Sequence, residues 1–389
     1  MRPDPAGAFL IDPGVTFLNH GSFGACPRPV LAAQRRWQTR MERQPVAFLD
    51  PGRGLTGRMR AAMAALAAEV GAAPGNIAAQ VNATQALAVV ARSLRLAPGD
   101  EIVTTDHEYA AMEKLWAEVA RKAGARVVVA RVPLPLAEAA AFTAAVAGAF
   151  TARTRVLFLS HVTSPTALVF PLEGVIAAAR ARGILSVIDG AHGPGLVPLE
   201  LDALGADFYA GNGHKWLLAP KGTGFLHARP ERQAMVEPAA ISHGWTAEGA
   251  SPGPFGNPAF VDALEFQGTR DPSAFLAIPA AIAFRARHGW PAVMARCRDL
   301  AQDFAARMGR RTGLPPLSAP AFSAPQMVAV PLPPCDTGRL KRALLERHGI
   351  EVPCHDWGGR ALVRASVQAY NGAGDLDRLE TALARELGL

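Results

Sequence analysis

The feature that most constrains the fold is a regular alternation of strand-like and helix-like segments between residues 77 and 229. Alanine-rich helical stretches separate the first five strand-like segments. This alternation predicts an α/β domain whose mostly parallel sheet is covered by helices on both faces. The link between the last two segments is too short for a helical crossover, so one of them is expected to be antiparallel. The expected strands are Ile77–Val81, Glu101–Thr105, Arg126–Val132, Arg155–His161, Leu185–Asp189, Phe208–Ala210 and Gly224–Ala228.

Polar residues gather where these expected strands end. Ligands of open α/β sheets bind at the carboxyl ends of the strands. Several polar groups at one sheet edge indicate a binding site more strongly than any one of them alone. The groups are Asn82, Asp106 with His107, His161–Thr166, Asp189–His192 and Asn212–Lys215.

The rest of the chain suggests a second, smaller domain. A chain of 389 residues is too long for a single hydrophobic core. We expect an irregular N-terminal arm over 1–30 and the large α/β domain over 31–265. Residues 266–389 are expected to form a small α+β domain, whose first helices can bridge the two. In that domain Gln326–Leu332 and Leu362–Val367 are strand-like, and 336–348 and 374–388 are helical.

Composition excludes several classes of protein. The formal net charge is +7, but no basic block is interleaved with aromatic residues, so no nucleic-acid partner is expected. No apolar run reaches the roughly 18 residues of a membrane span, and the N-terminal stretch lacks the apolar core of a signal peptide. We expect a soluble, cytoplasmic protein. No CxxC occurs among the cysteines, so neither a disulfide framework nor a metal site is expected. They are Cys26, Cys297, Cys335 and Cys354.

A lysine at one strand end indicates the chemistry of the site. Lys215 lies between His214 and Trp216, an environment that can lower the pKa of an amine and activate it. We expect Lys215 to form a Schiff base with pyridoxal 5'-phosphate (PLP), and then to act as general base at the substrate Cα. Asp189 is expected to hold the protonated ring nitrogen. Lys221, in a turn after a proline, is the competing lysine and is expected to be solvated or structural.

A PLP enzyme also needs a phosphate site, a flat partner for the ring and a cation for the substrate. Residues 82–85 open a helix after a strand, where backbone N–H groups can bind phosphate; a plain N-cap is the alternative. His107 or Tyr109 can stack on the ring, or can simply pack in its loop. Arg364, in a strand-like run, can hold a substrate carboxylate with its fork of N–H groups, or can form an internal ion pair.

Segments spread over nearly the whole chain resemble the class V aminotransferase family of fold-type I PLP enzymes, and within it the isopenicillin N epimerase-like branch. This resemblance implies a PLP-dependent transferase-like fold, with a mainly parallel seven-stranded sheet and a small α+β C-terminal domain. The segments are FLNHGSFGACP (17–27), VNATQAL (81–87), DHEYAAM (106–112), HVTSPTALVFPLE (161–173), DGAHGPG (189–195), GNGHKWLLAPKGTGFL (211–226), GTRDPSAFLA (268–277) and VRASVQAYN (363–371).

The resemblance also implies residue roles. The catalytic residues would be Lys215, Asp189 and His107, with His107 stacked on the ring. His192 takes the position where relatives often have Gln near the phenolic oxygen. Thr269 would reach the phosphate of a neighbouring subunit, so a homodimer is expected. The implied phosphate ligands are Ala83, Thr84 and His214. The implied substrate residues are Asn19, His20 and Ser22 at the entrance and Arg364 on the carboxylate.

Two positions depart from the family pattern. Many relatives have Ser or Thr three residues before the lysine, where this chain has Asn212, so one phosphate contact is missing or replaced. Cysteine desulfurases of the family carry a catalytic Cys ahead of the carboxylate-binding Arg. Cys354 precedes Arg364 and is followed by His355, which can activate it; a structural Cys354 is the alternative. Further candidate site residues are Tyr109, Ser164 and Thr166.

The expected function is PLP chemistry at Cα of an amino acid or an amino-acid-derived substrate. Epimerisation, transamination and C–S cleavage share one carbanion, and the sequence does not separate them. The main alternative is a cysteine desulfurase, or a C–S lyase acting on a cysteine conjugate. A non-catalytic PLP-binding protein, or a cofactor-free interaction protein, is the alternative from another class.

Overall fold

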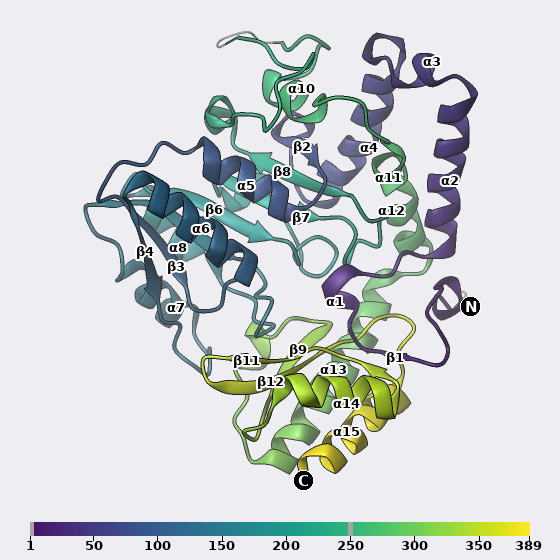
Figure 1. Ribbon diagram of the computed structural model, residues 1–389, viewed down its shortest axis with the longest axis vertical. Helices are drawn as coiled ribbons and strands as arrows, with labels where there is room; N and C mark the ends of the chain where they lie inside the picture. The colour runs from purple at the N-terminus through teal and green to yellow at the C-terminus, as the bar shows by residue number, and fades with distance from the viewer. Residues whose placement is uncertain (1–3, 248–251) are drawn as a thin grey trace.

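The structure is a computed structural model that describes residues 4–247 and 252–389. The predicted sheet lies at the centre of the larger part of the molecule (Figure 1). The strand order is β2-β8-β7-β6-β5-β3-β4, and only β8 runs antiparallel to its neighbours. The expected antiparallel strand is therefore confirmed. The strands are β2 (Ile77–Gln80), β3 (Glu101–Thr105), β4 (Arg126–Ala130), β5 (Thr154–Ser160), β6 (Leu185–Gly190), β7 (Phe208–Asn212) and β8 (Gly224–Ala228).

Helices cover both faces of this sheet. Alternate residues of β5 show the two sides: Val156 and Phe158 pack in one apolar cluster with α5 and α6, whereas Leu157 and Leu159 pack in another with α4, α7 and α8. Burial on both sides explains why the strands are apolar throughout rather than alternating. The helices are α4 (Leu55–Glu69), α5 (Ala83–Ser93), α6 (Ala110–Ala123), α7 (Ala139–Ala147) and α8 (Leu172–Arg180).

The C-terminal part forms a separate antiparallel sheet, below the large one in Figure 1. Its order is β11-β12-β9, with β9 (Met327–Leu332), β11 (Cys354–Trp357) and β12 (Arg360–Ser366). Helices α13 (Trp290–Thr312), α14 (Thr337–His348) and α15 (Ala373–Leu387) pack around it. Helix α12 (Ile278–Arg287) contacts α2 (Arg28–Arg43) and α4, whereas α13 contacts β9. These helices thus connect the two sheets, and the domain boundaries stay a prediction.

The N-terminal arm is more ordered than the sequence suggested. Strand β1 (Thr16–Phe17) pairs in parallel with β10 (Ile350–Glu351), and α1 (His20–Phe23) follows. Pairing with a distant strand leaves no local sequence signal, which is why β1 and β10 were not predicted. Strand β11 (Cys354–Trp357) was also not predicted, although it forms a hairpin with β12 (Arg360–Ser366) across Gly358 and Gly359, a local turn signal that the sequence does contain. The arm is thereby fixed to the C-terminal part, close to Arg364. Short helices complete the fold: α3 (Pro45–Leu49), α9 (Leu201–Leu204), α10 (Ala259–Glu265) and α11 (Ser273–Leu276). Among the described residues, no helix is both long and apolar enough to cross a membrane.

Candidate active site

Lys215 lies in the loop between β7 and β8, at the carboxyl edge of the large sheet. Its Nζ is 3.0 Å from Nε2 of His192. Its carbonyl accepts hydrogen bonds from Leu218 N–H (3.2 Å) and His20 Nε2 (3.1 Å), which hold the loop in place. Burial lowers the pKa of Lys215 to about 7; nearby Arg364 lowers this pKa further, and Asp189 opposes the shift. A substantial fraction of the amine is therefore unprotonated at neutral pH, as a nucleophile or general base requires.

Asp189 is buried near the end of β6. Its Oδ1 accepts a hydrogen bond from Ala191 N–H at 2.9 Å. Burial raises the pKa of Asp189, whereas that hydrogen bond and the charge of Lys215 act in the opposite direction. A buried carboxyl of this kind is stabilised in its charged form by a cationic N–H donor. The protonated ring nitrogen of PLP is such a donor, so Asp189 and Lys215 both fit this cofactor.

Arg364 enters the same site from β12. It is 5% exposed, and Nη1 donates to the carbonyl and to Oγ of Ser164 (2.5 and 3.0 Å). Nη2 donates to Ser22 Oγ at 3.2 Å, whereas Nε has no hydrogen-bond partner. Burial lowers the pKa of Arg364 to about 10. Within the described chain no carboxylate pairs with this guanidinium, so the alternative of an internal ion pair is wrong.

The N-terminal arm supplies one contact to Arg364 and one support for Lys215. Ser22 Oγ also donates to Asn19 Oδ1 (2.5 Å), and Asn19 Nδ2 donates to Glu351 Oε1 (2.9 Å). His20 is fully buried, with Nδ1 2.9 Å from the hydroxyl of Tyr370. The structure thus places Ser22 beside the guanidinium and His20 beneath the lysine loop. That Asn19, His20 and Ser22 line a substrate entrance stays a prediction.

The expected phosphate end lies at the start of α5. Asn82 caps the helix by accepting from Gln85 N–H at 2.9 Å. Asn212 Oδ1 accepts from Ala83 N–H at 2.9 Å, so this backbone donor is already engaged. Thr84 is exposed on the first turn. His214 is part-buried, its Nδ1 is 3.4 Å from the carbonyl of Thr223, and burial lowers its pKa to about 4.

His107 is buried beside the strand ends rather than open to solvent. Its Nδ1 is 2.7 Å from Thr166 Oγ1, and its ring centroid lies 4.3 Å from that of Trp357. Its Nε2 has no hydrogen-bond partner. Tyr109 is 46% exposed. Stacking of His107 on the cofactor ring stays a prediction.

The environment of Cys354 is unsuited to a nucleophile. The side chain is buried on β11, opposite Val363 of β12. Burial raises the pKa of the thiol to about 12, so the reactive thiolate is scarce at neutral pH. Cys354 and His355 are consecutive residues of β11, so their side chains point to opposite faces of the strand. Nε2 of His355 also lies 2.9 Å from the carbonyl of Pro165, and His355 is therefore not placed to activate the thiol. The structural interpretation of Cys354 is therefore favoured. Lys221 donates to the carbonyl of Gly24 at 2.9 Å, as expected of a structural lysine.

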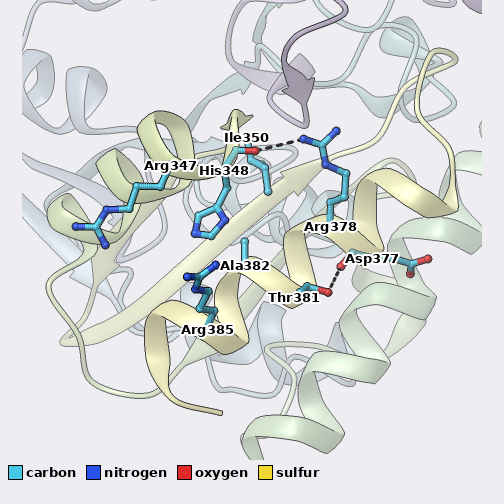
Figure 2. Close-up of a pocket in the computed structure, with 8 residues that line it drawn as sticks. All are labelled: Arg347, His348, Ile350, Asp377, Arg378, Thr381, Ala382 and Arg385. Atoms are coloured by element: carbon cyan, nitrogen blue, oxygen red, sulfur yellow. Dashed lines mark hydrogen bonds between the residues drawn. The ribbon is translucent and has the colours of Figure 1, made fainter.

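Two cavities lie away from the site formed by Lys215, Asp189 and Arg364. Thr269 is exposed and borders a cavity of about 250 Å³ that includes Leu55, Met59 and His243. Figure 2 shows the other, of about 460 Å³, between α14 and α15. Its arginine side chains are solvated at the surface, and the hollow contains none of the predicted site residues. It is therefore not the active site.

Sequence reasoning missed some residues of the site. Trp216 Nε1 donates to His192 Nδ1 at 3.2 Å. Glu108 is buried and accepts from Ser160 and Thr105, and burial raises its pKa to about 8. Trp357 reaches His107 from the C-terminal sheet. A carboxylate directly after His107 was visible in the sequence, whereas no local signal could place Trp357 there.

The α/β fold with a lysine, a buried aspartate and a buried arginine at the carboxyl edge defines a fold-type I PLP-dependent enzyme. The aminotransferase class-V family model matches residues 25–379. The chain belongs to the class V aminotransferase family.

Relatives and solved structures agree with this assignment. The chain is 40% identical to an isopenicillin N epimerase of Amycolatopsis lactamdurans over 383 residues, which covers 96% of this chain and 95% of the relative. It is 31% identical to a putative L-cysteine desulfhydrase of Oryza sativa subsp. japonica, covering 95% and 83%.

Among solved structures, a cysteine desulfurase of Escherichia coli has a TM-score of 0.79 at 23% identity, covering 98% of this chain and 97% of that one. A cystine C–S lyase variant with glycine covalently linked to PLP has a TM-score of 0.77 at 22% identity, covering 95% and 96%. At these identities the likeness shows the fold.

Proposed function

We propose that this protein removes and returns the Cα proton of an amino-acid substrate, with PLP attached to Lys215 and inversion at Cα as the outcome. The observation that carries this proposal is Arg364, a buried guanidinium without a carboxylate partner in the described chain, close enough to lower the pKa of Lys215. A buried unpaired cation is costly, and an incoming α-carboxylate compensates it with charge-assisted hydrogen bonds.

Arg364, Lys215 and Asp189 each have a separate role in the proposed reaction. Bound PLP supplies an electron sink that makes a neighbouring Cα–H acidic. Arg364, steadied by Ser164 and Ser22, orients the substrate carboxylate. Lys215, with its pKa lowered to about 7, takes the proton from Cα. Asp189 keeps the ring nitrogen protonated.

Thr84 and His214 would hold the phosphate, and His192 would approach the phenolic oxygen. His107 would cover the ring. Because Asn212 engages Ala83 N–H, the backbone contribution to phosphate binding would come from Thr84.

Inversion is favoured by the similarity to isopenicillin N epimerases. C–S cleavage is the second candidate, because cysteine desulfhydrases are also among the relatives. A mechanism through a Cys354 thiolate is disfavoured by its burial and raised pKa, so a C–S lyase of this chain would release sulfur directly by β-elimination.

We further propose a homodimer in which Thr269 completes the neighbouring site. Support comes from its exposed position beside a cavity with the apolar lining residues Leu55 and Met59. A cytoplasmic location stays a prediction from the sequence.

The decisive experiment incubates the purified protein with L- and D-amino acids and cysteine conjugates in deuterated water. Inversion predicts deuterium at Cα and the opposite enantiomer by chiral chromatography, without keto acid or sulfide. Lys215→Ala should abolish exchange, whereas Lys221→Ala, which removes the structural lysine, is the matched control. A colourless protein that binds no PLP, or normal turnover by Lys215→Ala, would refute the proposal.

A further inference from the structure

Two consecutive residues contact opposite nitrogens of one imidazole ring. Trp216 Nε1 lies 3.2 Å from His192 Nδ1, and Lys215 Nζ lies 3.0 Å from His192 Nε2. His192 is 2% exposed and Trp216 is fully buried. Water therefore has little access to this ring, and the two neighbours decide which of its nitrogens carries a proton.

The donor properties of indole leave one arrangement. Trp Nε1–H is a donor only, so His192 Nδ1 must be the acceptor and cannot carry a proton. A neutral imidazole has one N–H, which is then on Nε2 and points at Lys215. The lysine nitrogen can accept that hydrogen bond only through a lone pair, as the neutral amine. A protonated Lys215 would place an N–H donor against the N–H of His192.

We infer that Trp216 is a positioning residue: its indole N–H fixes the proton of His192 on Nε2, and His192 thereby holds Lys215 as the neutral amine. The inference rests on the proposed function, in which Lys215 must be neutral to attach PLP and to accept the Cα proton. Burial also lowers the pKa of His192 well below its usual value, which agrees with a neutral ring.

The surroundings hold Trp216 in this orientation. Its ring packs against His20, with the centroids 5.0 Å apart, and His20 is itself fixed between Lys215 O and Tyr370. Gly195 has φ +81°, and a Cβ there would lie 2.6 Å from the backbone of Trp216. Glycine at this position thus allows the backbones of residues 195 and 216 to lie close together, and this close packing helps to hold the indole ring of Trp216 in its orientation.

The test compares the pKa of Lys215 in wild type and Trp216→Phe, using the 389-residue chain freed of PLP. Trace acetylation with acetic anhydride across pH, read by mass spectrometry of the Lys215 peptide, reports this pKa. Wild type should show a midpoint near 7. Loss of the indole donor lets the imidazole proton of His192 move to Nδ1, so that Nε2 can accept a hydrogen bond from the charged ammonium group of Lys215. This hydrogen bond stabilises the charged lysine, so the midpoint should rise by about one to two units. In a His192→Ala background, Trp216→Phe should add no further shift.

A matched control and a second measurement keep the inference testable. Trp116 is equally buried, but its Nε1 has no hydrogen-bond partner, so Trp116→Phe should leave the midpoint unchanged. In wild type, ¹⁵N NMR of the histidine side chains should show His192 protonated at Nε2, which needs no variant to fold. An unchanged midpoint in folded Trp216→Phe, an equal shift in Trp116→Phe, or a proton on Nδ1 would overturn the inference. Absorbance on adding PLP separates the two failures: wild type that binds no PLP refutes the proposed function, whereas bound PLP with an unshifted midpoint refutes only the role of Trp216.

Discussion

Replacing Arg364 by Met removes the buried cation while keeping an unbranched side chain of similar length. A substrate carboxylate bound by the guanidinium fork would lose about two charge-assisted hydrogen bonds, each worth roughly 1.5–3 kcal/mol. Since about 1.4 kcal/mol corresponds to a factor of ten, kcat/KM should fall by roughly 10²- to 10⁴-fold. Arg364→Lys keeps the charge but lacks the fork, so its loss should be smaller.

The same substitution should cost little stability. The variant loses the hydrogen bonds to Ser164 and Ser22, but it also removes a buried charge without a carboxylate partner in the described chain. These effects oppose each other. We therefore expect the free energy of unfolding in urea to change by no more than roughly 1–2 kcal/mol.

The assay measures kcat/KM for an amino acid and for the matching amine that lacks the carboxylate. The amino acid should lose far more than the amine, because only its carboxylate uses the guanidinium. A small loss shared by both compounds is expected, since Arg364 also lowers the pKa of Lys215. Equal losses for both compounds, or a loss below about fivefold for the amino acid, would show that Arg364 does not bind the substrate carboxylate.

Other residues of the site lead to further predictions. Lys215 acts as a base after the substrate has released it from PLP, and only as the neutral amine, whose pKa is lowered to about 7; kcat, which reports groups of the substrate complex, should therefore rise with pH through about 7 and then level off, and a flat kcat profile from pH 6 to 9 would contradict this role. Cys354→Ala should change turnover and any sulfide release by less than about twofold, since the buried thiol has a pKa of about 12; a tenfold loss would restore a nucleophilic role. Asn212→Ala leaves the buried Ala83 N–H without its acceptor and should lower the free energy of unfolding by about 1–3 kcal/mol. Asn212→Asp, which keeps an acceptor oxygen, is the control in the same urea titration.

Local patterns were sufficient for the large sheet. Strand-like runs between helical stretches predicted all seven strands of that sheet, and for β3 and β8 they predicted the observed bounds. The short link around Lys215 correctly indicated that one strand is antiparallel. These features depend on the period of apolar residues and on loop length, both of which are properties of neighbouring positions.

The sequence by itself therefore determined the family, the α/β fold and the sheet edge at which Lys215 and Asp189 lie. Only the tertiary structure decided the surroundings of these residues. It placed Arg364 of β12 beside Ser164 and Ser22, and it packed the ring of Trp357 against that of His107. It also buried the Cys354 thiol, which is therefore unreactive. The physical reason is that pKa values, hydrogen-bond partners and burial depend on contacts between segments far apart in the chain, and no local pattern records those contacts.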